Sequence, residues 1–422
     1  MKMDKHWDVI VIGAGPAGLA AALAAQEAGA RVCIIEREER TGGILKQCIH
    51  DGFGLIRFKE KLTGPEYAYR YVEMIRAARV PVILNTFVLS LARENEQYSL
   101  TLVNSTDTVF VFTAGAVILA TGCRERTAYQ VFIHGTRPAG VLTAGQAQYY
   151  INIQGYMPGK KCVILGSGDI GLIMARRLTL EGARVLGVYE ILAEPSGLTR
   201  NIAQCLLDYK IPLHLNSTVT RVHGKSRVKG VTVNKVDKNL QPIEGTEEYI
   251  ECDTLLLSVG LIPENDIAFP LNLELDPRTR GPVVDQNLMT SQPGIFSCGN
   301  ALHVSDLVDY VSENGASAGK NAAQYALSAG TAAERDLLIR KGKLLYTVPQ
   351  VINPDFRGKV TVYFRSAESM RKGRLQVRVG DDVILTKKYP VLRPPEMERF
   401  ILDLPAAREP GEKIIISLDK ET

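Results

Sequence analysis

The sequence lacks the paired cysteines that bind metals or exchange disulfides. Its 422 residues include seven cysteines, and no two of them form a Cys-x-x-Cys motif. Zinc sites, cysteine-bound iron–sulfur clusters and redox dithiols usually show such local spacing, so all three are disfavoured. The histidines show no ligand spacing either, and we expect no metal site. An odd number of scattered cysteines favours reduced thiols in a cytoplasm over a secreted disulfide scaffold.

Excess charge of one sign is also missing. Lysine and arginine number 50 against 46 aspartates and glutamates, which gives a net charge of +4. So small an excess does not favour nucleic acid as a partner. Hydrophobic residues make up 45% and charged residues 23% of the chain, which is typical of globular proteins and excludes a disordered or fibrous chain.

Long hydrophobic runs are scarce, and the one candidate has another explanation. Residues 9–25 carry no charge and resemble a signal sequence or a short membrane span. However, Gly13, Gly15, Pro16 and Gly18 interrupt the run, which reads better as a strand, a glycine turn and an alanine-rich helix. We therefore expect a cytoplasmic protein without a transmembrane segment or targeting signal.

The glycine turn has the spacing of a dinucleotide-binding fingerprint. Gly13 permits a tight turn, Gly15 allows a pyrophosphate to approach the backbone, and Gly18 lets the helix pack against the strand. The N-terminal end of the helix then offers free N–H groups to the diphosphate. The next strand, over 31–35, ends at Glu36, which is placed to accept hydrogen bonds from a ribose.

The same construction occurs a second time. A strand over 161–165 leads into Gly166, Gly168 and Gly171, and the following strand ends at Glu190. Two fingerprints with nearly the same internal spacing predict that the chain binds two adenine dinucleotides. Glu190 favours NAD(H) over NADP(H), because a carboxylate repels a 2′-phosphate.

Further strands follow each fingerprint. Short strands are predicted at 109–112 and 116–120, the second ending at Thr121-Gly122, and residues 254–260 have the same shape. Residues 294–300 form a short strand and turn ahead of a helix predicted over 306–329.

With these motifs, residues 5–330 resemble the two-dinucleotide flavoproteins of the pyridine nucleotide–disulfide oxidoreductase superfamily. The resemblance implies FAD at the first fingerprint and NAD(H) at the second, which is inserted into the FAD domain. It implies FAD contacts from Gly13, Gly15, Pro16, Ala17, Gly18, Glu36, Arg37, Gly42, Gly43, Lys46, Thr121, Gly122, Gly299 and Asn300. It implies NAD contacts from Gly166, Gly168, Asp169, Ile170, Gly171 and Glu190.

Two departures from the family pattern matter. Disulfide-reducing members carry Cys-x4-Cys after the first Gly-Gly or a Cys-x-x-Cys in the NAD domain. Here only Cys48 follows Gly42-Gly43, so disulfide reduction is not expected. Asn300 stands where an aspartate usually contacts the flavin ribityl chain. Asparagine keeps an acceptor and adds donors, so FAD binding should survive.

Several runs are similar to one subgroup of this superfamily, among them residues 42–54, 121–126, 135–140 and 168–175. The subgroup contains FAD subunits of opine, hydroxyproline and sarcosine oxidases. It also contains the flavoprotein encoded beside an FAD-dependent glycerol-3-phosphate dehydrogenase, to which the likeness is greatest. The resemblance implies electron exchange with a partner dehydrogenase subunit that carries flavin or an iron–sulfur cluster, in a hetero- or homo-oligomer. Such a partner would also allow a peripheral location at a membrane.

Hydride transfer between nicotinamide and flavin needs stacking geometry more than a protein nucleophile. The helix beginning near Asp306 is one candidate for stabilising negative charge on a reduced flavin. Lys46 is another, and a solvated loop lysine is an equally good interpretation. Cys48 and Cys298 are the leading cysteines for a chemical role, although a single cysteine near a strand more often serves as small apolar packing.

The predicted fold is α/β with two Rossmann-like domains and a small C-terminal all-β domain. The FAD-binding domain is expected at 1–125 and 256–335, the NAD(H)-binding domain at 126–255. Alternating apolar residues within 343–422 predict a β-sandwich, interpreted as a surface for a partner or another copy.

The favoured function is an FAD oxidoreductase that exchanges a hydride with NADH and electrons with a partner subunit. Two alternatives stay open at this point. One is a self-sufficient NADH oxidase that reduces oxygen to peroxide. The other is a non-catalytic FAD-bound scaffold, against which the intact second fingerprint and Glu190 argue.

Overall fold

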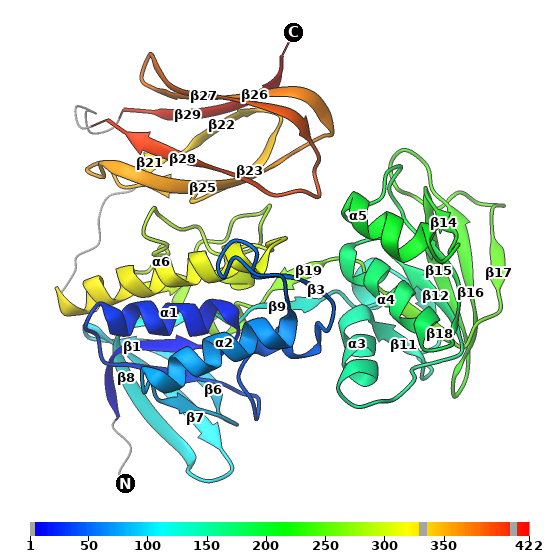
Figure 1. Cartoon of the computed structure of the whole chain (residues 1–422), viewed down its shortest axis with the longest axis horizontal. Coiled ribbons are helices and arrows are strands. Elements are labelled where there is room, and N and C mark those ends of the chain that lie inside the picture. The colour runs from blue at the N-terminus through cyan, green and yellow to red at the C-terminus, as the bar shows by residue number, and fades with distance from the viewer. Residues whose placement is uncertain (1–4, 329–335, 406–411, 422) are drawn as a thin grey trace. The chain divides into compact units, whose positions relative to one another are not determined.

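The computed structural model describes residues 5–328, 336–405 and 412–421 of the chain. The chain divides into two compact units, residues 1–123 with 263–422 and residues 124–262. Both contain a Rossmann-like parallel sheet with helices, and the first also carries a C-terminal domain made of strands (Figure 1). The α/β class and the all-β C-terminal domain predicted from the sequence are confirmed.

A seven-stranded sheet forms the centre of the first unit, in the order β5-β2-β1-β8-β7-β6 with β20 also paired to β8. The strands are β1 (His6–Ile12), β2 (Val32–Ile35), β5 (Val82–Ile83), β6 (Phe87–Glu94), β7 (Gln97–Asn104), β8 (Thr108–Leu119) and β20 (Ile295–Ser297). Strands β5, β2, β1, β8 and β20 run parallel, whereas β6, β7 and β8 form an antiparallel meander. Parallel strands covered on both faces account for the uninterrupted apolar run at 9–12.

One strand is longer than the sequence predicts. The two strands expected at 109–112 and 116–120 are a single strand, β8. Its first half pairs with β7 and its second half with β1, so neighbours hold it extended through Thr113, Ala114 and Gly115. The prediction of a break was wrong because these small residues form no turn, although they interrupt the run of large apolar ones.

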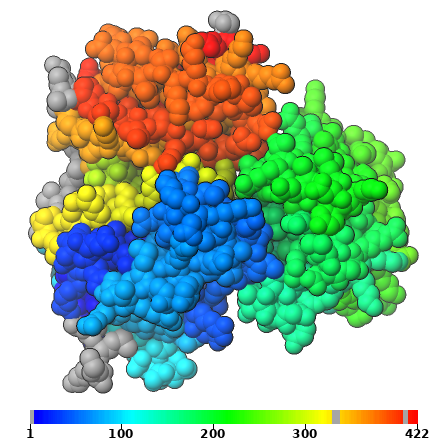
Figure 2. Space-filling view, in the orientation of Figure 1, coloured from blue at the N-terminus to red at the C-terminus, as the bar shows by residue number. Residues whose placement is uncertain are grey.

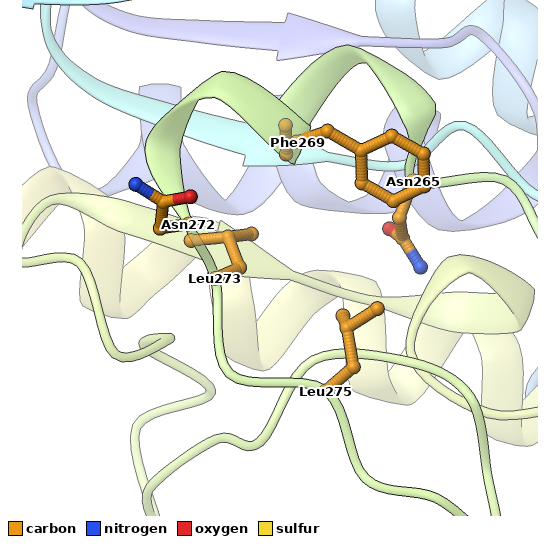
Figure 3. Close-up of a pocket in the computed structure, with 6 residues that line it drawn as sticks. Asn265, Phe269, Asn272, Leu273 and Leu275 are labelled. Carbon is orange, nitrogen blue, oxygen red and sulfur yellow. The ribbon is translucent and has the colours of Figure 1, made fainter.

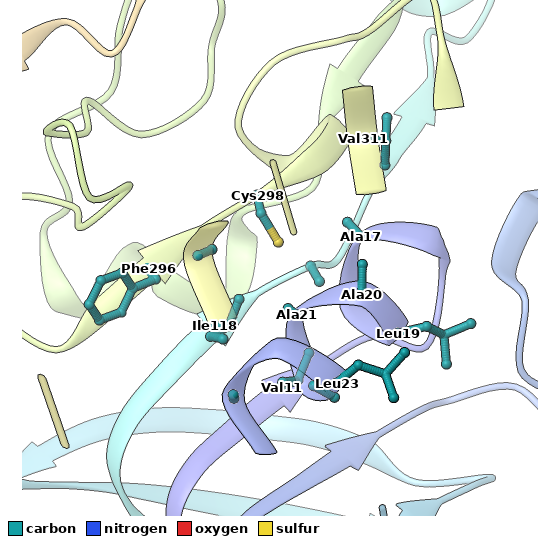
Figure 4. Packing of buried hydrophobic residues seen from close by; sticks show 14 of the residues in the cluster. Val11, Ala17, Leu19, Ala20, Ala21, Leu23, Ile118, Phe296, Cys298 and Val311 are labelled. Carbon is teal, nitrogen blue, oxygen red and sulfur yellow. The ribbon is translucent and has the colours of Figure 1, made fainter. Parts of the chain in front are cut away.

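Two helices pack closely against each other in the first unit. They are α1 (Pro16–Glu27) and α6 (Val308–Leu327), which lies within the predicted 306–329. A Cβ on Gly315 would lie 2.2 Å from the Ala17 carbonyl oxygen, and one on Gly319 would lie 2.0 Å from that of Ala21. Figure 4 shows the alanines of α1 in the same buried cluster as Ile118, Phe296 and Val311. Glycines in α6 thus let the two backbones approach.

Helix α2 (Gly64–Ala77) begins with a capping box. The Thr63 hydroxyl accepts from the Glu66 N–H, and the Glu66 carboxylate accepts from the Thr63 N–H. The preceding elements are η1 (Gly43–Gln47), β3 (Asp51–Phe53) and β4 (Leu62–Thr63). In the space-filling view, α2 and the segment before it (blue) lie on the surface of this unit (Figure 2).

The second unit is built on a five-stranded parallel sheet in the order β11-β18-β12-β13-β14, beside a four-stranded sheet in the order β10-β15-β16-β17. The first sheet has β11 (Val141–Thr143), β12 (Lys161–Leu165), β13 (Arg184–Tyr189), β14 (Leu213–His214) and β18 (Thr254–Leu257). The second has β10 (His134–Gly135), β15 (Ser217–Gly224), β16 (Val228–Lys235) and β17 (Glu248–Ile250). Its helical segments are η2 (Tyr129–Val131), α3 (Ala144–Asn152), α4 (Asp169–Leu180), α5 (Thr199–Ile202) and η3 (Ala203–Leu207). The chain enters this unit through β9 (Cys123–Glu125) and leaves it through β19 (Leu261–Pro263).

The C-terminal domain consists of two main sheets around a shared apolar cluster. One contains β22 (Ile339–Gly342), β26 (Met370–Val379), β27 (Asp382–Leu392) and β29 (Ile414–Lys420); the other contains β23 (Leu344–Val348), β25 (Gly358–Ser366) and β28 (Glu398–Leu404). A small pair, β21 (Asp336–Leu337) and β24 (Val351–Ile352), lies outside these sheets. Alternate residues of β25 and β26 point into the cluster, as the period-two pattern predicts.

The C-terminal domain is not isolated from the rest of the first unit. Tyr346, Val348, Tyr363 and Met397 belong to the same buried cluster as α1 and α6. Part of its surface is therefore covered within the chain itself. Across the described residues, no helix combines the length and the apolar character needed to cross a membrane.

Candidate functional site

The first glycine turn connects β1 to α1, and protein packing explains two of its three glycines. Gly13 has a φ of +109°, and a Cβ there would lie 2.4 Å from the Ala120 carbonyl oxygen. A Cβ on Gly18 would lie 1.9 Å from the Gly13 carbonyl oxygen. These two positions require glycine whether or not a ligand binds.

Gly15 differs from its neighbours, because nothing in the protein requires a glycine there. Its φ of −77° suits any residue, and the nearest atom to an added Cβ would be the Gly43 Cα at 4.0 Å. The turn is thus left bare at the N-terminal end of α1, where no side chain caps the helix. A bare backbone beside free helix N–H groups fits the pyrophosphate of FAD.

Other segments predicted to contact FAD come together at this turn. The Gly42 N–H donates to the Ala14 carbonyl at 2.8 Å, and a Cβ on Gly43 would lie 2.9 Å from the Gly15 Cα. A Cβ on Gly299, at φ +60°, would lie 2.7 Å from the Ala17 Cβ. The structure therefore brings the first turn, the Gly-Gly turn and the late Gly299 turn into contact. Pro16 begins α1, and Arg37 is exposed after the end of β2.

Glu36 is buried and tied to the turn. One carboxylate oxygen accepts from the Ala14 N–H at 2.7 Å and the other from the Glu38 N–H at 2.9 Å. Each oxygen keeps a second lone pair for a ribose hydroxyl. Glu36 thus fixes the turn and remains able to accept from a ligand.

Thr121 and Gly122 are connected to the Gly299 turn through two residues that the sequence did not single out. The Thr121 hydroxyl donates to the Glu264 carbonyl, and the Glu264 N–H donates to the Gly122 carbonyl at 2.9 Å. The adjacent Asn265 amide donates to the Ala301 carbonyl at 2.8 Å. This chain of hydrogen bonds fixes two of the turns predicted to contact FAD relative to each other. No local pattern marks Asn265, so only the structure identifies it.

Asn265 also lines a cavity of about 200 Å³, together with Phe269 and Leu275 (Figure 3). The other lining residues are Ala268, Asn272 and Leu273. None of them is a residue predicted to contact a dinucleotide, and we assign no ligand to this cavity.

Asn300 uses its side chain within the protein. Its amide oxygen accepts from the Ser305 N–H at 3.1 Å, and its amide nitrogen lies 3.6 Å from the Cys123 sulfur. The preceding Gly299 N–H donates to the Asn314 side chain at 3.1 Å. Both ends of the amide are thus engaged within the protein, and each keeps one further hydrogen-bonding position that a ligand could use.

The three candidates for a chemical role have different surroundings. The Lys46 ammonium donates to the Arg40 carbonyl at 2.9 Å. Cys48 is buried, and desolvation raises the pKa of its thiol to about 12. Cys298 is fully buried, and desolvation likewise raises its thiol pKa to about 12. Both thiols therefore stay protonated at neutral pH, which disfavours nucleophilic use. A catalytic role for these residues stays a prediction.

The second turn, between β12 and α4, repeats the logic of the first. Cβ atoms on Gly166 and Gly171 would lie 2.1 Å from the Ser258 carbonyl oxygen and 2.7 Å from the Ser258 Cβ. Gly168 has a φ of −62°, and its Cβ would meet the Ser258 hydroxyl only at 3.4 Å, an ordinary contact. As at Gly15, the middle glycine leaves backbone bare for a ligand. Ile170 is half-buried in the first turn of α4.

Asp169 begins α4 but points its carboxylate to neighbouring protein groups. One oxygen accepts from the Leu198 N–H at 2.8 Å and from the Asn201 amide at 2.6 Å. These bonds hold the segment that follows β13. They also hydrogen-bond a carboxylate whose negative charge would otherwise repel a pyrophosphate at this end of the helix.

Glu190 is buried and heavily hydrogen-bonded. One oxygen accepts from the Ser167 N–H at 2.9 Å, the Ser167 hydroxyl at 2.6 Å and the Ser196 hydroxyl at 2.9 Å. The other accepts from the Leu192 N–H at 3.1 Å. The two serines were not predicted, although the middle residue of Gly166-Ser167-Gly168 lies within the motif. Among the described residues, no cluster of three or more metal-ligating side chains occurs.

Several known proteins are similar to this chain. The chain is 26% identical to one of the opine oxidase subunits of Agrobacterium tumefaciens, over 72% of this chain and 63% of that protein. It is 30% identical to the HcnB subunit of the hydrogen cyanide synthase of Pseudomonas protegens, over 63% of this chain and 59% of that protein. It thus spans about three fifths of the length of these relatives.

Solved structures show the same fold. The thioredoxin reductase of Lactococcus lactis matches 76% of this chain and 99% of its own with a TM-score of 0.64 at 19% identity. The family model for pyridine nucleotide-disulphide oxidoreductases matches residues 7–326, which include both glycine turns and the Gly299 turn. The chain therefore belongs to the pyridine nucleotide-disulphide oxidoreductase family, flavoprotein oxidoreductases that bind FAD and NAD(P)H.

Proposed function

We propose that this chain is an FAD-dependent subunit that exchanges a hydride with NADH and passes electrons to or from a partner dehydrogenase subunit. When bound, FAD and NAD(H) supply the redox chemistry, so that the protein has to hold and orient them. Unit one would hold FAD at the Gly15, Gly43 and Gly299 turns. Unit two would hold NADH at Gly168 and Glu190.

One observation carries the cofactor part of the proposal. Gly15 and Gly168 are the middle glycines of the two turns, both have ordinary φ values, and an added Cβ at either position would make only ordinary contacts, no closer than 3.4 Å, with the protein. Their neighbours in each turn are required by packing, whereas these two are not. A ligand pressed against the backbone is the remaining physical reason for glycine at both places.

The state of the cysteines supports electron transfer without a thiol relay. All seven cysteines are described, and none forms a disulfide. Burial raises the pKa of Cys48, Cys162 and Cys298 to about 12, and that of Cys252 to about 11. Thiols in this state are poor nucleophiles. Electrons that do not leave through a dithiol need another acceptor, and two relatives are named as subunits, which favours a partner protein.

The preference for NADH rests on Glu190. Its carboxylate is fixed by Ser167, Ser196 and the Leu192 N–H, so its negative charge cannot swing away. A fixed carboxylate at the end of the second strand favours ribose hydroxyls and opposes a 2′-phosphate.

The test is an anaerobic titration of the purified protein, loaded with FAD, with NADH. We expect the flavin absorbance to bleach on addition of about one equivalent, with Cys48→Ala behaving like the parent. Absence of bleaching would refute the exchange with NADH.

A second measurement identifies the electron acceptor. The rate at which the reduced flavin is reoxidised is compared for two acceptors, oxygen in air and the protein that copurifies with the tagged chain. A chain that purifies alone and consumes oxygen rapidly and steadily would refute the partner and support an oxidase.

A further inference from the structure

The connection between the Gly299 turn and α6 is partly buried and contacts the C-terminal domain. This connection follows η5 (Gly299–Ala301) and contains His303, whose side chain is 2% exposed. The His303 ring centroid lies 5.4 Å from that of Tyr363 and 6.2 Å from that of Tyr346. Two aromatic residues of the C-terminal domain therefore cover the chain a few residues beyond the FAD-facing turn.

Arg365, on β25 of the same domain, reaches this connection and uses all of its nitrogens. Its Nε donates to the Tyr346 hydroxyl at 2.9 Å, and Nη1 donates to the carbonyls of residues 394–395. Its Nη2 donates to the Val304 carbonyl at 3.3 Å and to the Asp306 carboxylate. With 13% of its side chain exposed, this is a largely buried and fully bonded guanidinium.

Asp306 directs both carboxylate oxygens to the C-terminal domain. One accepts from Arg365, and the other accepts from the Met397 N–H. Asp306 lies just before Leu307, the N-cap of α6. An uncompensated carboxylate here would offset the positive end of the helix. Arg365 therefore neutralises a charge at the helix end and also fixes the chain that leads into it.

The FAD-facing side of the connection is held as well. Asn300 accepts from the Ser305 N–H, the residue next to Asp306, and Gly299 donates to Asn314 within α6. On the opposite side, the Asp309 carboxylate accepts from the Arg57 N–H at 2.9 Å. The segment from Gly299 to the start of α6 is thus fixed by several hydrogen bonds, with Arg365 as its charged contact from the C-terminal domain.

We propose that Arg365 is a positioning residue for the FAD site, which acts by pairing with Asp306 at the start of α6. The proposal rests on the proposed function, since it takes FAD to lie against the Gly299 turn. It gives the C-terminal domain a role in the flavin environment, beside any role in docking. A reduced flavin carries more negative charge than an oxidised one, so the charge balance at Asp306 affects its reduction potential.

The test is a double-mutant cycle on the protein loaded with FAD, with the FAD dissociation constant and the flavin reduction potential as readouts. Arg365→Met leaves the Asp306 carboxylate uncompensated, so the potential should fall and FAD should bind about tenfold more weakly. Asp306→Asn leaves the guanidinium uncompensated, so the potential should rise. The double variant should return close to the parent potential.

Glu313→Gln is the matched control, because Glu313 in α6 also pairs with an arginine of the C-terminal domain, Arg399, at a more exposed position. It should leave the potential unchanged.

Potential shifts of the same sign in both single variants, or none in either, would overturn the proposal even if FAD affinity fell. If the flavin of the parent protein bleaches with NADH but the two single variants do not shift the reduction potential in opposite directions, only the positioning role is refuted. A parent that binds no FAD refutes the proposed function itself.

Discussion

Glu36 and Glu190 occupy the same place in the sequence pattern but have different surroundings. Each ends the second strand of its fingerprint and each is buried. Glu36 accepts two backbone hydrogen bonds, from Ala14 and Glu38. Glu190 accepts from backbone groups and from two serine hydroxyls. The second carboxylate is therefore held more firmly, which is consistent with the proposal that its charge selects between NADH and NADPH.

Replacing Glu190 by glutamine tests this selection. Glu190→Gln keeps the size and the acceptor oxygen but removes the charge that opposes a 2′-phosphate. We expect the ratio of kcat/KM for NADPH over NADH to rise about tenfold, because like-charge repulsion is removed. The measurement is steady-state reduction of an artificial acceptor with each nucleotide. Glu251→Gln, at an exposed glutamate paired with Lys161, serves as control and should leave the ratio unchanged. An unaltered ratio in Glu190→Gln would mean that another group sets the preference.

Substitutions at the two kinds of glycine in the first turn should have different effects, on FAD affinity at Gly15 and on apoprotein stability at Gly18. In Gly15→Ala the added Cβ would come no closer than 4.0 Å to a protein atom, the Gly43 Cα, so the melting temperature of the apoprotein should stay unchanged. FAD affinity should fall by roughly tenfold or more, since the added methyl group occupies ligand space. Gly18→Ala places its Cβ 1.9 Å from a backbone oxygen and should lower the apoprotein stability itself. Calorimetry of the apoproteins and fluorescence titration with FAD separate the two effects. Unchanged FAD affinity in a folded Gly15→Ala protein would contradict the assignment.

At the scale of elements, the contact between α1 and α6 affects the geometry of the turns that are proposed to hold FAD. Both helices begin next to such a turn, α1 after Gly15 and α6 after the Gly299 connection. They approach through Gly315 and Gly319 of α6, which face the Ala17 and Ala21 backbone. The close approach holds the start of α1 against the middle of α6, and in the proposed function the free N–H groups at the start of α1 face the dinucleotide.

A methyl group at this crossing should force the helices apart. In Gly319→Ala the Cβ would lie 2.0 Å from the Ala21 carbonyl oxygen, so a backbone shift is unavoidable. We expect a loss of about 2 kcal/mol in the free energy of unfolding, measured by urea denaturation. Ser317→Ala, on the exposed face of the same helix, is the control and should change stability by no more than about 0.5 kcal/mol. Equal stability of the two variants would show that the crossing adapts without cost.

At the scale of the whole molecule, the C-terminal domain is joined to the rest of the first unit by both apolar and charged contacts. Tyr346, Tyr363 and Met397 share its core cluster, and Arg365 pairs with Asp306. The sequence alone suggested a docking surface for a partner or a second copy. That interpretation stays a prediction for the outer surface of the domain, while one side of it already packs inside the chain.

This packing should make stability depend on pH through His303. Burial, with a contribution from Arg365, lowers the pKa of His303 from 6.5 to about 3. The folded chain therefore prefers the neutral ring, and unfolding takes up a proton at pH values between 3 and 6.5. The stabilising contribution is complete above 6.5 and is lost as the pH falls, by at most about 2 kcal/mol at pH 5.

The measurement is urea unfolding at pH 7.5 and pH 5, followed by the fluorescence of Trp7, the one tryptophan, which lies in β1 of the same unit. His303→Phe keeps a ring between the two tyrosines but cannot titrate, so it should lose less stability than the parent between these pH values. An identical pH dependence in both proteins would exclude His303 as the source. Comparing parent and variant cancels the titration of the other groups.

The sequence by itself determined the two fingerprints, their strands and helices, and the all-β C-terminal domain. These features are local, since each depends on residues close together in the chain, on glycine spacing and on periods of two or 3.6 residues. The same local evidence failed at β8, where small residues between two apolar runs do not form a break. There, pairing with β7 and then with β1 keeps the chain extended.

Only the tertiary structure decided which distant residues serve the site. Asn265 bonds to Ala301, and Arg365 bonds to Asp306. A buried asparagine and a buried arginine look like surface residues in a sequence, because burial depends on what the rest of the chain places around them. No periodic pattern in the sequence indicates such a partner. The fold brings the members of each pair together, and their low-dielectric surroundings strengthen the hydrogen bond of Asn265 and the ion pair of Arg365 with Asp306.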